Sequence, residues 1–441
     1  MSGESARPIY RTQKGETVVY RFIHTADIHL DSPLRSLALR NPELAELIGN
    51  ATRQAFMNII KLCLEEQVDA LLLAGDLYDG EQTSMKTARF LAGQLRRLHE
   101  AGTRVFIVRG NHDALSRITQ ELVLPDSVKL FGGRADAVEI DRGKTDFPIV
   151  IHGLSFAKPH APESLISKYK PPVEGAVNIG IMHTSLGGAP GHDLYAPCSV
   201  ADLQGTGFRY WALGHVHKRS VTDGDCTIVM PGNPQGRDIN EAGAKSVSLV
   251  TIGDDRAIRV EERNASIAQF ERIAVDATGI DDWHNLAAAL STSLRHARDG
   301  MSVDHLVARV QITGKTSLAW RVRRDLDLLK AEADDRSSVI GACWVEKLEV
   351  ACHAPTVIDG SGGDPVMELR RLIESRVGKS DSFQQAAIAI AEELAAQLPP
   401  ECRNFLGAGE SAFHDVLAEL SSEGADDVIA RLHAVADAGE A

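Results

Sequence analysis

The stretch YWALGHVH, residues 210–217, decides the fold, because a short buried run ends there in a glycine and two histidines one residue apart. Other short apolar runs along the chain also end in small or polar residues. These runs are VVYRFIH (18–24), ALLLAG (70–75), RVFIVRG (104–110) and VNIGIMH (177–183). Their lengths and their β-branched content favour strands over helices. The sequence therefore predicts a set of buried strands, each followed by polar side chains.

Helical patterns separate the first three of these runs. Residues 42–67 carry an apolar stripe of helical spacing, and residues 84–102 end at Gly102, a residue that commonly ends helices. Alternation of strand and helix indicates an α/β fold with helices flanking a sheet. Beyond residue 220 the pattern changes to strands joined by tight turns, which we expect to complete a two-layer β-sandwich.

The remainder of the chain predicts smaller units. Residues 268–355 alternate strand and helix patterns, as a small α+β domain does, and two helices are expected at 366–397 and 410–436. The expected organisation is an N-terminal extension (1–19), the sandwich domain (20–262), the α+β domain (268–355), a Gly-rich linker (356–365) and an acidic C-terminal helical region (366–441).

Composition limits the classes of protein. The formal net charge is −14, and residues 361–441 alone hold 15 acidic and 6 basic side chains. This charge argues against a broadly basic nucleic-acid coat, although local strips around Arg35, Arg40 and Arg53 are still compatible with DNA contacts. No apolar run is long enough to cross a membrane, and the N-terminus lacks the pattern of a secretory signal. We therefore expect a cytoplasmic protein whose six cysteines are mostly reduced core thiols.

Side chains suited to metal binding follow the predicted strands. They are Asp27 and His29, Asp76 and Asp79, Asn111, His112 and Asp113, His183, and His215 with His217. Ligands bind at the carboxyl ends of strands in open α/β sheets, so these side chains can converge on one place. Imidazoles and carboxylates suit Mn, Fe or Zn, and two such ions can hold a phosphate and activate a water. Each motif alone is weak, but their joint order favours a dinuclear metal site.

Taken in order, the motifs D-x-H, GDxxD, GNH[DE], H and GHxH resemble the signature of the calcineurin-like metallophosphoesterase superfamily. The segments RFIHTADIHLDSPL, AGDLYDGE, HTSLGG, YWALGHVHK and PGNPQGR resemble SbcD-type DNA repair nucleases, in particular their YhaO-like bacterial branch. The resemblance covers residues 20–260 and extends to 268–355 as the family's capping domain. It implies a manganese-dependent exonuclease or endonuclease that acts on DNA, works with an SbcC-like coiled-coil ATPase and forms a homodimer in many members.

The resemblance also implies a role for each residue. One metal ion would be held by Asp27, His29 and His217, and the other by Asn111, His183 and His215, with Asp76 bridging them. His112 would be the general acid for the leaving oxygen, which agrees with the need for a proton donor that is not a ligand. Asp113 would orient the ring of His112. In YWALGHVH, each histidine would then serve a different metal ion, and Gly214 would permit the turn.

Several other residues each have two possible roles. Asp79 stands where some relatives carry a histidine, so it is either a substrate contact or a turn residue. His192, in the glycine-rich loop 188–197, either contacts DNA or closes the loop. Asn233 and Arg237, in PGNPQGR, are candidates near the site, although Arg237 is equally suited to a surface ion pair. Trp211 is expected to pack in the core.

Two further classes of function remain open. A phosphatase, or a phosphodiesterase acting on small molecules or cyclic nucleotides, would use the same fold and the same metal ligands. A non-catalytic scaffold that binds DNA ends or an ATPase would be favoured by the loss of a ligand or of His112, and none of these residues is missing. The predicted capping domain favours a polymeric substrate by analogy alone.

Overall fold

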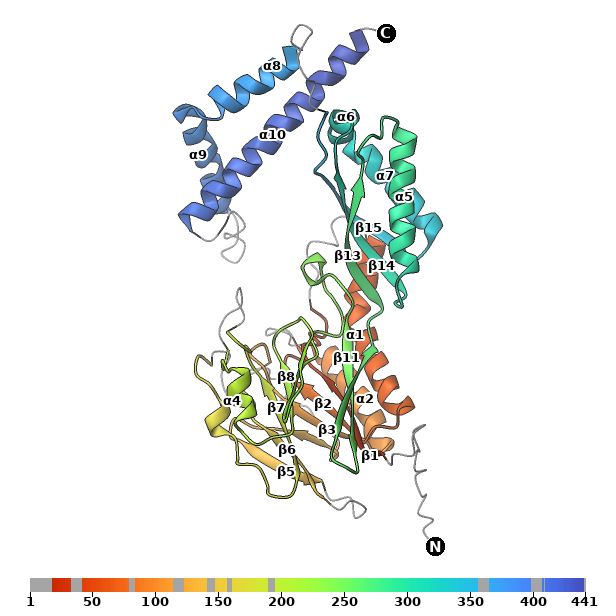
Figure 1. Cartoon of the computed structure of the whole chain (residues 1–441), viewed down its shortest axis with the longest axis vertical. Helices are drawn as coiled ribbons and strands as arrows, with labels where there is room; N and C mark the ends of the chain where they lie inside the picture. The colour runs from red at the N-terminus through yellow and green to blue at the C-terminus, as the bar shows by residue number, and fades with distance from the viewer. Residues whose placement is uncertain are drawn as a thin grey trace. The chain divides into compact units, whose positions relative to one another are not determined.

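The computed structural model describes residues 18–32, 42–78, 84–113, 123–140, 147–156, 161–188, 195–355, 365–397, 407 and 409–439. The chain divides into two compact units (Figure 1). One comprises Met1–Glu271 with Gly300–Val307, and the other comprises Arg272–Asp299 with Ala308–Ala441. The predicted α/β class is confirmed, and each unit is built as follows.

Two six-stranded sheets form the first unit. The first sheet consists, in spatial order, of β12 (Ile258–Asn264), β11 (Ser246–Gly253), β1 (Val18–Thr25), β2 (Ala70–Ala74), β3 (Arg104–Val108) and β4 (Val128–Leu130). The second consists of β5 (Asp136–Ile140), β6 (Ile149–Gly153), β7 (Val177–His183), β8 (Tyr210–Gly214), β10 (Thr227–Met230) and β9 (Ser220–Thr222). The predicted buried strands are confirmed as β1, β2, β3, β7 and β8.

Strand direction places the polar motifs at common edges. β1, β2, β3 and β4 pair in parallel, and so do β6, β7, β8 and β10. The carboxyl ends of parallel neighbours lie at the same edge of a sheet, so the segments that follow β1, β2 and β3 come together. The segments that follow β7 and β8 come together in the same way on the second sheet.

The two sheets pack face to face, as predicted for a sandwich. Successive side chains of a strand point to opposite faces, so Leu72 of β2 lies in the core between the sheets while Leu71 and Leu73 face the other way. The rings of Phe22 and Tyr210 meet edge to face across the sandwich, with centroids 5.3 Å apart. This shared core fixes the two sheets relative to each other.

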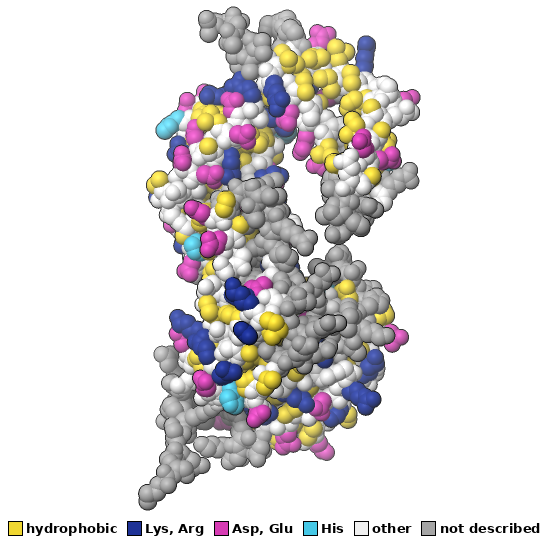
Figure 2. All heavy atoms as spheres, turned by 180° about the vertical axis from the view of Figure 1, so that it is seen from behind, with side chains coloured by type: hydrophobic (Ala, Val, Ile, Leu, Met, Phe, Trp, Pro, Cys, Tyr) yellow, Lys and Arg dark blue, Asp and Glu magenta, His cyan; other side chains and the backbone are white. Residues whose placement is uncertain are grey.

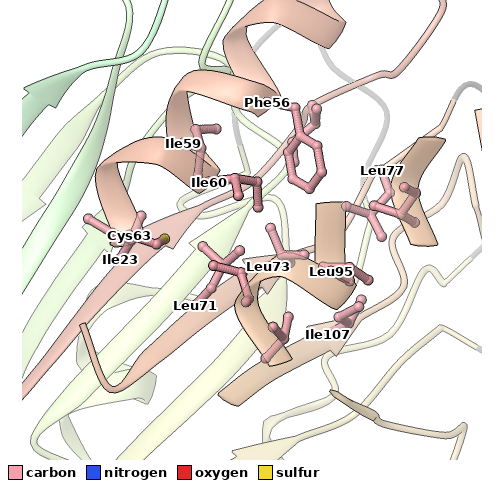
Figure 3. Close-up of a cluster of buried hydrophobic side chains, with 14 of the residues drawn as sticks. Ile23, Phe56, Ile59, Ile60, Cys63, Leu71, Leu73, Leu77, Leu95 and Ile107 are labelled. Carbon is pink, nitrogen blue, oxygen red and sulfur yellow. The ribbon is translucent and has the colours of Figure 1, made fainter. Parts of the chain in front are cut away.

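Helices α1 (Pro42–Glu65) and α2 (Met85–Glu100) cover the outer face of the first sheet. Figure 3 shows Phe56, Ile59 and Ile60 of α1 directed at Leu71 and Leu73 of β2. All five side chains are fully buried, and each such burial contributes roughly 1.5–3 kcal/mol. The predicted apolar stripe of 42–67 is therefore the contact surface of α1.

The outer face of the second sheet has its own apolar layer, which includes the short helix α4 (Val200–Gln204). Trp211 is fully buried there, stacks on Phe208 at 4.9 Å and donates its indole N–H to the carbonyl of Leu203. The expectation that Trp211 packs is confirmed. The pattern did not indicate α4, β4, β5 or β6, because each is short and lacks a clear period.

A three-stranded sheet, in the order β13 (Ala268–Asp276), β14 (His305–Thr313) and β15 (Cys343–Val350), follows the sandwich. It is accompanied by α5 (Trp283–Asp299), α6 (Ala319–Arg324) and α7 (Leu326–Ile340). Leu286, Leu290 and Leu294 are spaced four residues apart on one face of α5 and are buried. The expected small α+β arrangement is present here.

The prediction of a single helix at 366–397 is wrong. The structure has α8 (Pro365–Leu372), a π-helical turn (Ile373–Val377) and then α9 (Asp381–Gln397). Gly378 ends the first segment, and the hydroxyl of Ser380 accepts the backbone N–H of Phe383 at 3.4 Å, so Ser380 caps the start of α9. The last predicted helix is confirmed as α10 (Glu410–Gly439).

Exposed apolar side chains gather on these C-terminal helices, as Figure 2 shows. They are Leu369, Leu372, Val377, Phe383, Ile390, Leu394, Leu420, Val428 and Leu432. Asp426 of α10 pairs with Arg323 of α6 at 3.4 Å and with Arg370 of α8 at 3.0 Å. These ion pairs connect α10 to both neighbours.

Two expectations from composition bear on the described residues. Cys63, Cys198, Cys226, Cys343 and Cys352 are buried and form no disulfide, as predicted for core thiols, whereas Cys402 lies outside the described residues. Burial raises the pKa of Cys198, Cys226 and Cys343 to about 11, so these thiols stay protonated. Among the helices that the structure describes, none is long and apolar enough to cross a membrane.

Candidate metal centre

The predicted ligands converge where the carboxyl ends of the two sheets meet. Asp27, His29 and His217 each offer a ligand atom within 4.8 Å of the others. Asp27, Asp76 and His183 form a second group with the same spacing, so Asp27 belongs to both. Asp27 and His29 follow β1, Asp76 follows β2, His183 ends β7 and His217 follows β8, and these strands belong to two different sheets. The site therefore exists only because the sandwich brings both sheets to one edge.

The first group is arranged for a cation. The Nε2 atoms of His29 and His217 lie 3.2 Å apart, and their rings meet edge to face. Two imidazole nitrogens at this distance repel each other through their lone pairs unless a proton or a metal ion lies between them. Asp27 supplies the carboxylate beside them, and both His29 and Asp27 are buried. This donor set fits a divalent ion of the kind that takes mixed nitrogen and oxygen ligands.

The second group is organised around His183. Its Nδ1 lies 2.9 Å from the carbonyl oxygen of Ala74, which can only accept, so Nδ1 carries the proton. Its Nε2 then faces Asn111 Oδ1 at 3.0 Å and Asp76 Oδ2 at 3.3 Å. Burial opposes a charge on His183, but the Asp76 carboxylate overrides it and raises the pKa of His183 to about 9. The cluster thus attracts positive charge, which fits a metal ion as well as a proton.

His215 lies against the same cluster. Its backbone N–H donates to both carboxylate oxygens of Asp27, at 3.0 and 2.9 Å, which fixes that carboxylate. The His215 ring lies 5.2 Å from the His183 ring, centroid to centroid. The structure therefore brings His215 beside His183, as predicted, while its part in holding a metal ion remains a prediction.

The backbone is strained at the ligands. Asp27, His29, Asp76 and His215 have φ values of 52°, 46°, 52° and 104°. Residues other than glycine rarely occupy this left-handed region, and they persist there only when the surroundings impose it. The strand-end segments turn sharply at these positions and direct their side chains to one place.

Two glycines near the ligands stand where the structure has no room for a side chain. A Cβ on Gly110 would lie 2.2 Å from Asp76 Oδ1 and 2.8 Å from the His183 ring. A Cβ on Gly214 would lie 2.1 Å from the carbonyl oxygen of Ala74. The chain turns after Gly214, the last residue of β8, and the glycine also permits this close approach to Ala74.

His112 and Asp113 lie in the segment that follows β3, one exposed and the other buried. His112 is exposed, its ring lies 5.2 Å from the His29 ring, and its backbone N–H donates to Asp76 Oδ1 at 3.0 Å. Asp113 is fully buried and accepts the backbone N–H groups of Gly110 and Leu77, at 2.6 and 3.0 Å. Burial and the nearby Asp76 raise the pKa of Asp113 to about 7. Asp113 therefore ties the segment after β3 to the segment after β2, while its role in orienting the His112 ring stays a prediction.

Glu241 is a contact that the sequence pattern did not indicate. Its Oε1 lies 2.7 Å from Nδ1 of His217, and its Oε2 accepts the side-chain N–H of Asn233 at 2.9 Å. Burial favours the neutral carboxyl, but the bonds from His217 and Arg237 hold the pKa of Glu241 well below its usual range. A carboxylate behind a ligand histidine can come from any part of a fold, so spacing along the chain carries no signal for it.

Some of the predicted substrate contacts form ion pairs within the chain, and others lie outside the described residues. Arg237 pairs with Glu241 at 2.8 Å and approaches the hydroxyl of Ser32 at 3.5 Å, so a phosphate contact by Arg237 stays a prediction. Arg53 pairs with Asp31 through two hydrogen bonds of 2.5 Å, which favours a structural role for it. Asp79 and His192 lie outside the described residues, and so does Arg35.

Two family models match this chain. Residues 20–219 match the calcineurin-like phosphoesterase model, and residues 270–353 match the middle domain of metallophosphoesterase YhaO. The fold and the clustered ligands of the first unit agree with the calcineurin-like phosphoesterase match over residues 20–219. The chain carries a calcineurin-like phosphoesterase domain followed by a YhaO middle domain, so the resemblance seen in the sequence is confirmed.

Individual relatives agree with this assignment. The uncharacterized metallophosphoesterase YhaO of Bacillus subtilis (strain 168) is 35% identical over 260 residues, which cover 58% of this chain and 63% of that protein. DNA double-strand break repair protein Mre11 of Methanocaldococcus jannaschii is 30% identical over 205 residues, covering 45% and 51%. Mre11 of Sulfurisphaera tokodaii is 27% identical over 224 residues, covering 48% and 54%. The chain thus spans between half and two thirds of these curated relatives.

Proposed function

We propose that the protein hydrolyses phosphodiester bonds of DNA with two divalent metal ions, Mn²⁺ in particular, as an exonuclease or endonuclease in DNA repair. The family supports the coarser statement, a metal-dependent hydrolase of phosphoesters. The observation that carries the proposal is the pair of ligand groups sharing Asp27, with the exposed His112 beside them. Bound ions would supply positive charge that holds the phosphate and activates a water for in-line attack.

The residues of the chain would then divide the work. Asp27, His29 and His217 would hold one ion, and Asn111, His183 and His215 the other, with Asp76 between them. His112 would donate a proton to the leaving oxygen, because it is exposed to a substrate while its backbone is fixed by Asp76. Asp113 would keep that loop in place.

Two observations support the proposed partners, DNA and an SbcC-like coiled-coil ATPase. Relatives at 30% and 27% identity are named as double-strand break repair proteins. The exposed apolar side chains on α8, α9 and α10 also suit a docking protein, since large exposed apolar patches commonly mark interfaces. Such a complex would act in the cytoplasm, and homodimerisation remains part of this proposal.

Cleavage of end-labelled single-stranded and duplex DNA with Mn²⁺ tests the function. We expect His112→Ala to lower the cleavage rate about 10²–10⁴-fold, the usual contribution of a general acid, without preventing metal binding. His284→Ala, at an exposed histidine of α5, is the control and should cleave like the unaltered protein. Metal binding without DNA cleavage by either protein would refute the nuclease. Hydrolysis of small or cyclic phosphodiesters would then identify the alternative phosphodiesterase.

A further inference from the structure

His217 is supported from behind by a carboxylate of the segment that follows β10. Glu241 ends the short 3₁₀ turn Ile239–Glu241, and its Oε1 lies 2.7 Å from His217 Nδ1. Both side chains are mostly enclosed, with 12% of Glu241 and 24% of His217 exposed. Water therefore competes weakly for this hydrogen bond.

Glu241 is itself held firmly. Its Oε2 accepts the backbone N–H of Arg237 at 2.8 Å and the Asn233 amide at 2.9 Å. The guanidinium of Arg237 reaches Oε1 at 2.8 Å. Both carboxylate oxygens are thus engaged, so Glu241 offers His217 an acceptor in a fixed position.

The segment that carries Glu241 is anchored to β13 as well. The buried Gln235 accepts the N–H of Ile267 at 3.0 Å and donates to the carbonyl of Ala268 at 2.8 Å. Gly243 N–H donates to the carbonyl of Phe270 at 2.9 Å. Contacts on both sides of Glu241 therefore restrict its movement, which is what support of a binding site requires.

The consequence for His217 is a single orientation. A carboxylate accepts only, so Nδ1 of His217 carries the proton and Nε2 keeps its lone pair. That Nε2 is the atom 3.2 Å from Nε2 of His29, inside the group formed with Asp27. The hydrogen bond from Glu241 thus selects both the tautomer and the ring rotation that direct Nε2 into the site.

We propose that Glu241 is a positioning residue, which raises the affinity of the Asp27–His29–His217 group for a divalent ion by fixing His217. The inference rests on the proposed metal centre and adds to it a residue outside the predicted ligand set. Loss of such a supporting partner typically weakens metal binding about 10- to 100-fold. The contribution is expected at one metal ion only, because Glu241 contacts no residue of the His183 group among the contacts described.

Titration calorimetry of the metal-free full chain with Mn²⁺ tests this. Glu241→Ala is expected to weaken one binding step about 10- to 100-fold and to leave the other unchanged. The matched control is Glu346→Ala, because Glu346 also pairs with an arginine, Arg309, at 2.7 Å and is 13% exposed. Both variants lose a half-buried ion pair, so thermal unfolding in chelator shows their common effect on stability. Equal Mn²⁺ affinity for the two variants would overturn the proposal.

A double-variant cycle separates positioning from general damage. If Glu241 acts through His217, then Glu241→Ala costs nothing further in Mn²⁺ affinity once His217→Ala is present. An undiminished effect in the His217→Ala background would refute positioning. An unaltered protein that binds two Mn²⁺ but cleaves no DNA would contradict the proposed nuclease and leave this inference standing. Failure of the unaltered protein to bind Mn²⁺ would overturn both.

Discussion

At the scale of the residue, buried histidines of the sandwich differ in the partners of their ring nitrogens. His24 precedes the Asp27 motif closely, yet it lies in the core between the sheets, with Nδ1 3.0 Å from the Tyr210 hydroxyl and Nε2 3.0 Å from the carbonyl of Leu213. Both ring nitrogens are used by the fold. His183 has one nitrogen on a carbonyl and the other aimed at Asp76 and Asn111. The partners of each ring, and not the residue type, separate a histidine that packs in the core from a candidate metal ligand.

The buried His24 predicts a pH dependence of stability. Burial lowers its pKa from 6.5 to about 3 in the folded protein, so the unfolded chain binds more protons between these values. The free energy of unfolding should therefore fall as pH drops below about 6.5, by up to about 1.4 kcal/mol per pH unit from this group. Urea unfolding at about pH 7 and about pH 5 measures it.

The variant His24→Gln, which keeps a donor for Leu213, should lose this part of the pH dependence. The exposed His99→Gln, on α2, should keep it. An identical pH response of His24→Gln and the unaltered protein would show that His24 contributes nothing.

Gly110 predicts a steric effect on the site. In Gly110→Ala the new methyl group would meet Asp76 Oδ1 and the His183 ring, so one of them must move. We expect Mn²⁺ binding to weaken on the order of 10-fold or more, measured by calorimetry. Gly132→Ala is the control, because its Cβ would meet no atom within 4 Å. Unchanged binding by Gly110→Ala would mean that the loop adjusts freely.

At the scale of the element, the loops at the strand ends are held by the helices behind them. Asp31, after β1, has a φ of 60° and is bound by Arg53 of α1 and by Thr87 of α2. Burial favours a neutral Asp31, but the hydrogen bonds from Arg53 and Thr87 lower its pKa overall. The helices that pack on the first sheet therefore also fix the segment that carries Asp27 and His29.

Helix α1 contains a glycine whose replacement tests helix propensity alone, because the replacement changes no packing contact. Gly49 lies within α1, is exposed, and a Cβ there would meet no atom within 4 Å. Gly49→Ala should raise the free energy of unfolding by about 0.5–1 kcal/mol, because glycine loses more backbone entropy in a helix than alanine does. Urea unfolding at neutral pH checks this. A lower stability would indicate that Gly49 has a contact or a conformation that helix propensity does not describe.

At the scale of the whole molecule, the predicted metal site belongs entirely to one unit. All of its predicted ligands lie at or just after the ends of strands in the two sandwich sheets, and the α+β sheet and C-terminal helices contribute none of them. A ligand stabilises the folded state to which it binds, so Mn²⁺ should act on the stability of the first unit.

Scanning calorimetry with and without Mn²⁺ measures this effect. At an ion concentration about 100 times its dissociation constant, the free energy of unfolding of the first unit should rise by about 2.7 kcal/mol. The transition of the second unit should not shift. His217→Ala should reduce the shift of the first transition. An equal rise of every transition would place metal binding elsewhere or show that the chain unfolds as one cooperative body.

The sequence predicted the strands that carry the site, helices α1 and α2 and the motif residues after each strand. These features depend on local periodicity, which is visible in a window of a few residues. It did not predict the break at Gly378–Ser380, although Gly378 and the capping Ser380 are local signals that end one helix and start another, nor strands β4, β5 and β6, which are short. The close approach of Gly214 to Ala74 was not predicted either, because Ala74 lies on another strand.

What the sequence determined by itself was the set of chemically competent side chains and the strand ends that bear them, since residue type and period are properties of the local chain. Only the tertiary structure decided which of these side chains come into contact. The 3.2 Å approach of His29 to His217, the support of His217 by Glu241 and the space beside Gly110 all join segments distant in sequence. Such contacts are set by the tertiary packing of strands and loops, within and between the two sheets, which no local pattern contains.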